Sequence, residues 1–119
     1  MSGLVKSKSS QPARSLAYEP AQPLWQRVPR HDEEGRRLSD FMMLIPRLKR
    51  RQPETIRAVL DSISAVLIQY EHVVMYADMN LKINTLWVTI RPVAGMCLEI
   101  PAAIKVAVPE ALLVASREH

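Results

Sequence analysis

Residues 72–91 read HVVMYADMNLKINTLWVTIR, and this stretch decides the fold. Its first part, 72–78, is rich in β-branched and aromatic residues, which predicts a strand. Its last part, 85–91, alternates strictly, with Leu86, Val88 and Ile90 on one side. The short connection between the two parts, around Asn80 to Asn84, predicts a tight antiparallel pairing of the two strands.

Two strands and two helices flank this hairpin. Before it, the apolar run 41–45 stops at Pro46 and predicts a buried central strand. The segment that opens at Pro53 has apolar residues at helical spacing and predicts an amphipathic helix of about 17 residues. After the hairpin, a helix is expected from near Leu98, with Pro101 in its first turn, and a fourth strand over 111–116.

The order strand, helix, strand, strand, helix, strand predicts a fold class, α+β of the ferredoxin-like type. Right-handed crossovers place both helices on one face of a four-stranded antiparallel sheet. Residues 39–119 are assigned to this domain. Residues 1–38 are rich in Pro, Ser and Arg, with apolar residues at no period, and are expected to form a flexible, disordered tail. Within it, Trp25 lies between prolines and is a candidate anchor for the tail or a short partner-binding motif.

Composition limits the function classes. A chain of 119 residues has room for one small domain and excludes an enzyme with two lobes. The single cysteine, Cys97, excludes an internal disulfide, and the sequence indicates no cofactor and no metal site. A reducing, cytoplasmic location is expected. No stretch of about 18 apolar residues is present, so no membrane partner is expected.

The candidate partner or ligand face lies on the side of the sheet that the helices leave uncovered. Trp87, Thr89 and Arg91 share this face by alternation, and Tyr76 joins them in one of the two registers. A face with Trp and Tyr is too apolar to be left wet. Its occupant is expected to be a second copy of the chain, which would make a homodimer; the tail, a ligand or nucleic-acid bases stacked on Phe41 and Trp87 are the alternatives.

A second candidate surface is basic. Four cations, Arg47, Lys49, Arg50 and Arg51, lie between the first strand and the first helix, beside the helix N-terminus. They form either a solvated loop or an anion site for phosphate, an acidic protein or nucleic acid. The net charge of +4 permits such a partner without requiring it.

Catalytic groups are sparse in this sequence. His72 is expected at the surface at a strand end, and Cys97 is expected to be buried with no general base beside it. The leading hypothesis is therefore a non-enzymatic interaction or regulatory module that self-associates through its sheet and binds a protein or small-molecule partner. One alternative is a nucleic-acid-binding protein that uses the basic loop 47–51 and the tail. The other is a small dimeric α+β barrel enzyme whose cavity is lined by His72, Tyr76, Trp87 and Arg91.

Overall fold

The computed structural model describes residues 31–117 of the chain. Their elements, in chain order, are β1 (Ser39–Leu44), the short 3-10 turn η1 (Leu48–Arg50), α2 (Pro53–Gln69), β2 (Val74–Asn80), β3 (Thr85–Ile90), α3 (Met96–Ala107) and β4 (Leu112–Arg117). This order of strands and helices confirms the α+β, ferredoxin-like arrangement that the sequence predicts.

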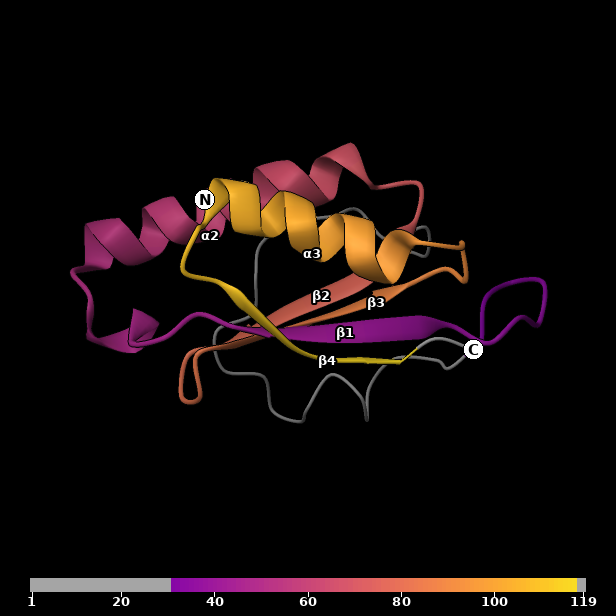
Figure 1. The fold of residues 1–119 in the computed structure, drawn as a ribbon, viewed down its shortest axis with the longest axis horizontal. Helices are drawn as coiled ribbons and strands as arrows, with labels where there is room; N and C mark the ends of the chain where they lie inside the picture. The colour runs from indigo at the N-terminus through magenta and orange to yellow at the C-terminus, as the bar shows by residue number, and fades with distance from the viewer. Residues whose placement is uncertain (1–30, 118–119) are drawn as a thin grey trace.

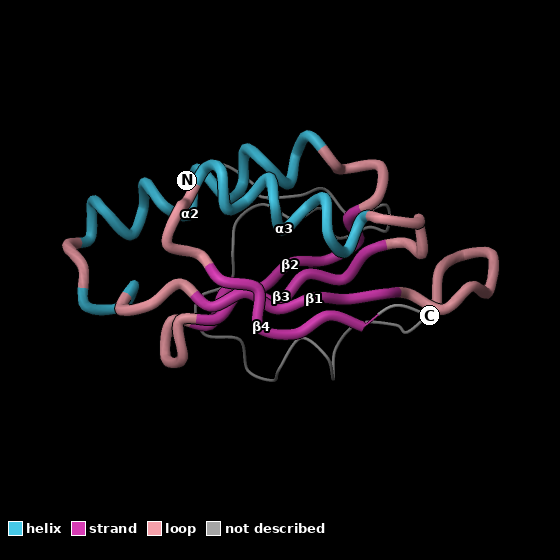
Figure 2. Tube along the Cα trace, in the orientation of Figure 1, coloured by secondary structure: helices cyan, strands magenta, loops and turns pink. Residues whose placement is uncertain are grey.

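The four strands form one antiparallel sheet in the order β2-β3-β1-β4, so β1 and β3 are central and β4 is an edge. Both helices lie on one face of this sheet, with α3 nearer the viewer and above β1 and β4 (Figures 1 and 2). Phe41 pairs with Val88 and Met43 pairs with Leu86, which aligns apolar side chains of the two central strands toward the helices. The register is thus set by the burial of one face.

The core fills the space between the sheet and the helices. α2 begins at Pro53, whose missing N–H has no partner to lose in the first turn, and it buries the apolar stripe that includes Leu60, Ile63 and Leu67. α3 adds Ile100 and Ile104, both fully buried. Each such side chain contributes about 1.5–3 kcal/mol on burial. This apolar layer is what holds the two central strands against the helices.

α3 begins at Met96, two residues before the expected start, so the expectation that Pro101 lies in the first turn is wrong. The helix begins earlier because Gly95 adopts the left-handed conformation, with φ 83°, and its carbonyl accepts hydrogen bonds from Leu98 and Glu99. Pro101 therefore lies in the second turn, buried, where it has no N–H to donate to the carbonyl of Cys97.

Candidate interaction surfaces

The open face of the sheet carries three of the four residues that the sequence places there. Tyr76 of β2 is the direct cross-strand partner of Thr89, and Trp87 lies between Met42 of β1 and Asp78 of β2. The extra residue at a bulge in β2, between Val74 and Tyr76, selects this register. Trp87 and Tyr76 are half-buried and Thr89 is only 5% exposed. These side chains therefore offer less free surface than a bare sheet would.

Arg91, the fourth residue, is engaged within the chain. Its guanidinium donates to both carboxylate oxygens of Glu33, over 2.7 Å and 3.1 Å, and lies 4.0 Å from Asp32. The hydrogen bond to Glu33 raises the pKa of Arg91, and nearby carboxylates add to the shift against the opposing effect of burial. Arg91 thus fastens the turn before β1 to the end of β3.

That turn spans residues 31–37, in the segment that the sequence analysis assigns to the tail. The buried carboxylate of Asp32 accepts hydrogen bonds from the N–H groups of Glu34 and Arg36 and from the Arg36 side chain, all within 2.9 Å. Burial alone would raise the pKa of Asp32, but these hydrogen bonds together lower it. Gly35, with φ 81°, donates its N–H to the carbonyl of Asp32. Asp first and Gly fourth is a β-turn signature that the sequence reasoning missed.

The structure separates the four cations of the basic loop into three exposed side chains and one that is paired. Arg47, Lys49 and Arg50 are exposed around η1, whereas Arg51 is half-buried and paired with Glu110, 59 residues later. Arg51 also donates to the carbonyl of Pro46, 3.2 Å away. Its guanidinium therefore connects the start of α2 to the turn before β4, and it is not free to bind an anion beside the first three cations.

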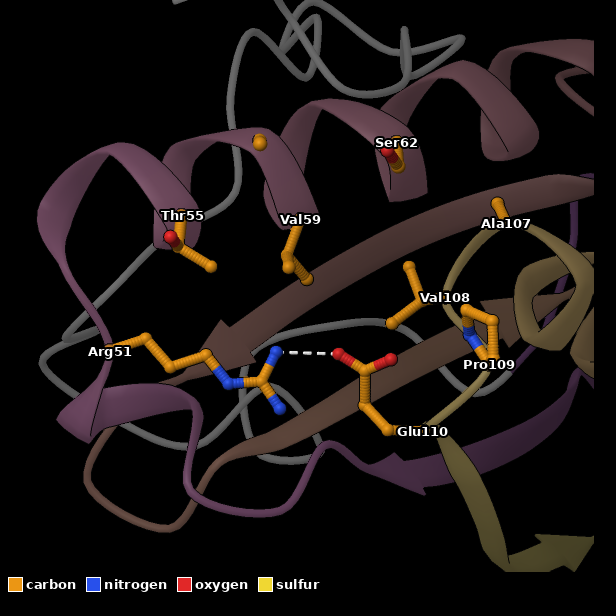
Figure 3. A pocket seen from close by; sticks show the side chains of 9 residues that line it. Arg51, Thr55, Val59, Ser62, Ala107, Val108, Pro109 and Glu110 are labelled. Carbon is orange, nitrogen blue, oxygen red and sulfur yellow. Dashed lines mark hydrogen bonds and ion pairs between the residues drawn. The ribbon is translucent and has the colours of Figure 1, made fainter.

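Arg51 and Glu110 lie at one end of a groove of about 200 Å³ between α2 and the α3–β4 turn (Figure 3). Its walls are short side chains from both elements: Thr55, Ala58, Val59, Ser62, Ala107, Val108 and Pro109. The hydrogen bond from Arg51 lowers the pKa of Glu110, which favours the charged form of this carboxylate. Because the cation and the anion neutralise each other, the groove has no unpaired charge to recognise a ligand.

The residues considered for catalysis are exposed, engaged or buried within residues 31–117. His72 is exposed in the turn before β2, whereas Arg91 of the same candidate group is bound to Glu33. Cys97 is buried at the start of α3, with its sulfur 3.8 Å from the carbonyl oxygen of Asp40. Within residues 31–117, no three His, Cys, Asp or Glu side chains gather as metal ligands would. Trp25 lies outside the described residues.

The strongest apolar exposure lies where the sequence analysis placed no site. All six residues of β4 are exposed, and Leu112, Leu113 and Val114 in succession are 45%, 40% and 54% exposed. On α3, which packs beside β4, Leu98 and Val106 are also exposed. The edge position of β4 produces this surface, and an edge cannot be read from one strand's sequence. We call it the β4–α3 flank, formed by Leu98, Ala102, Val106 and Leu112–Val114.

Within residues 31–117, neither α2 nor α3 has the length and apolar content that a membrane-spanning helix needs. Comparisons with protein-family models, with curated proteins and with solved structures find no match for this chain.

Proposed function

We propose that this chain is a non-enzymatic interaction module that associates with a second copy of itself through the β4–α3 flank. The observation that carries the proposal is the edge strand: three consecutive apolar residues of β4 are 40–54% exposed at the side of the sheet that has no neighbouring strand within residues 31–117. An apolar edge of this kind is a template for another strand. Covering it would stabilise a small domain whose own core is limited.

A second copy of the chain can pair with this edge by symmetry. Antiparallel pairing of β4 with the β4 of another copy, around a twofold axis normal to the sheet, makes one patch serve both partners. The two sheets then join into a single eight-stranded sheet, since each copy contributes four strands. Because the axis is normal to the sheet, both pairs of helices stay on the same side of it.

In this proposed dimer the two copies of α3 would also pack against each other. Strands pair about 4.8 Å apart, so β4 would lie about 2.4 Å from the axis and β1 about 7.2 Å from it. α3 packs against both β1 and β4, which places it about 5 Å from the axis. The two copies of α3 would then lie about 10 Å apart, close to the usual packing distance of helices. The joined strands and the paired helices therefore form one continuous interface.

The side chains of α3 on this flank suit close approach. Lys105 reaches the carbonyls of Pro109 and Ala111, so its face of the helix points toward the start of β4. Leu98, seven residues earlier, lies on the same face, and the small, exposed Ala102 lies between them. A small residue at the middle of an antiparallel helix pair leaves room for the two backbones, while Leu98 supplies the apolar contact.

The open face is the other route to a dimer, and it is less suited. Trp87 and Tyr76 there are already half-buried, and Arg91 is held by Glu33.

Sedimentation velocity of the full chain over micromolar concentrations tests the proposal. We expect a concentration-dependent dimer that Val114→Lys weakens by at least about tenfold, because two valines lose their burial and two lysines approach each other. The matched control is Val93→Lys, which changes another exposed valine, 43% exposed against 54% for Val114, in the β3–α3 loop and should leave the dimer intact. Circular dichroism checks that each variant is folded.

Two results contradict the proposal. A wild-type chain that stays monomeric at tens of micromolar would remove self-association altogether. A dimer that survives Val114→Lys but dissociates in Trp87→Glu would place the contact on the open face instead of the flank.

A further inference from the structure

We infer that the end of the domain carrying Arg47, Lys49, Arg50 and Lys82 binds the phosphate backbone of nucleic acid. This function does not depend on self-association, since β4 takes no part in it. Five of the eleven Lys and Arg side chains within residues 31–117 are engaged: Arg36 and Arg91 with the 31–37 turn, Arg51 with Glu110, Arg117 with Asp40, and Lys105 with backbone carbonyls.

Six cations remain, and all six are exposed with no carboxylate partner among residues 31–117. Arg37 lies in the 31–37 turn and Arg57 on α2, whereas the other four, Arg47, Lys49, Arg50 and Lys82, lie at one end of the sheet. Three surround η1, and the fourth is in the β2–β3 hairpin, which lies at the same end of the sheet (Figure 1). We call this group the cationic end. Unpaired cations that face one region leave a local excess of positive potential, which attracts a polyanion.

The cationic end is held by its backbone. The N–H of Lys49 donates to the side-chain oxygen of Asn84 over 2.8 Å, and the N–H of Ile45 donates to the Asn84 carbonyl over 2.9 Å. Leu48, in the middle of η1, is fully buried in the core. Because turn and hairpin are already fixed to each other, binding would order only the cationic side chains, which lowers its entropic cost.

Two strained residues mark the same place. Arg47 and Asn84 are the only residues other than glycine with positive φ in the described chain, at 59° and 55°. Asn tolerates this conformation, but an Arg there is uncommon. Strained backbone tends to be kept where it positions a functional group. Here it sets the direction of the turn that presents the cations.

The arrangement suits phosphates better than an acidic protein. The cations extend from two neighbouring turns, and in the groove nearby the charge of Arg51 is neutralised by Glu110, so this groove offers no free cation to an acidic peptide. A nucleic acid presents regularly spaced charges that separate side chains can contact at the same time. Base stacking on the central strands is not available to Phe41, which is 1% exposed and faces the helices. We therefore expect binding that is independent of sequence.

Fluorescence anisotropy with a labelled random-sequence duplex of 20 base pairs tests the inference on the full chain. Four phosphate contacts predict a slope of log K against log salt of about −3.6, which is a loss of about two orders of magnitude between 50 and 200 mM salt. The test variant combines Arg47→Asn, Lys49→Gln, Arg50→Gln and Lys82→Gln. Asn is chosen at position 47 because it accepts positive φ, which protects the fold. This four-fold variant should lose nearly all of the salt dependence.

The matched control neutralises four cations outside the domain, with Lys6→Gln, Lys8→Gln, Arg14→Gln and Arg27→Gln. It carries the same change in net charge, and we expect it to keep a slope near −3.6. The inference is overturned if the wild type does not bind at 50 mM salt, or if the control loses the slope and the test variant keeps it. Competition by polyglutamate as strong as by unlabelled duplex would also overturn it, in favour of an acidic protein.

Discussion

The backbone N–H of Lys49 donates a hydrogen bond of 2.8 Å to the side-chain oxygen of Asn84, 35 residues later in the chain. The contact joins the turn after β1 to the hairpin between β2 and β3. Asn84 has φ 55°, and this left-handed conformation is one that asparagine adopts more readily than most residues. Asn84 thus has two roles: its backbone adopts the left-handed conformation of the hairpin, and its side chain accepts a hydrogen bond from the neighbouring turn.

Replacing Asn84 separates these two roles. Asn84→Gly still adopts the left-handed backbone conformation without strain but loses the side-chain hydrogen bond, so we expect the free energy of unfolding to fall by about 1 kcal/mol. Asn84→Ala loses the hydrogen bond and also strains the backbone, so we expect a fall of about 2–3 kcal/mol. Urea unfolding of both variants measures the difference. Equal effects of glycine and alanine would show that the conformation of residue 84 costs nothing.

The Arg91–Glu33 pair predicts a local effect. Arg91→Gln removes two hydrogen bonds that hold the 31–37 turn against the end of β3, and should speed amide hydrogen exchange at Glu34 and Arg36. Global stability should change by less than about 1 kcal/mol, because Glu33 is mostly solvent-exposed. Arg37→Gln is the control, since Arg37 is exposed in the same turn and has no ion pair within residues 31–117. Equal acceleration in both variants would contradict a clasping role for Arg91.

Acid should destabilise the domain through Asp32 and Glu110. Both carboxyls have a pKa below the ordinary value in the folded chain, Asp32 because its hydrogen bonds outweigh burial and Glu110 mainly because of Arg51. A depressed folded pKa contributes stability that is complete above the unfolded pKa of about 4 and is lost as the pH falls through the folded pKa. Unfolding free energies measured from about pH 6 downward should therefore decrease below about pH 4.

Glu110→Gln isolates one of these contributions. It should flatten the acid limb of the pH profile and cost up to about 1 kcal/mol near neutral pH, since the Arg51–Glu110 pair is partly exposed. Glu71→Gln changes an exposed carboxylate that has no ion pair among residues 31–117 and serves as the control. An acid limb unchanged in Glu110→Gln would mean that the pair contributes nothing to folding.

Pro101 gives a prediction about α3. Its position in the second turn removes a helical hydrogen bond to the carbonyl of Cys97, a defect that costs about 3 kcal/mol in a helix interior. Pro101→Ala restores the N–H but removes part of a buried ring, which offsets some of the gain. We expect a net increase of about 1 kcal/mol in the free energy of unfolding, measured by thermal and urea denaturation. A decrease would mean that the ring's packing outweighs the hydrogen bond.

The sequence by itself determined the elements of this fold. The alternation of Leu86, Val88 and Ile90 and the helical spacing after Pro53 identify which side chains face the core, and these faces are the ones buried. Such periodicities are local, because a strand or helix turns its side chains at fixed intervals along the chain. Burial of the matching faces then leaves few ways to pack six elements.

Tertiary structure alone decided the surfaces. Arg47 and Arg51 are close in sequence, yet one is exposed and the other is paired with Glu110 after the whole domain closes. Arg91 follows the same alternation as Trp87 and Thr89, which predicts a free side chain on the open face. In the structure its guanidinium is instead bound to Glu33, which lies 58 residues away in the chain. Likewise, β4 reads as an ordinary apolar strand until the sheet order places it at an edge. Ion pairs and exposed sheet edges depend on contacts between segments that are distant in sequence. A local sequence pattern does not predict such contacts.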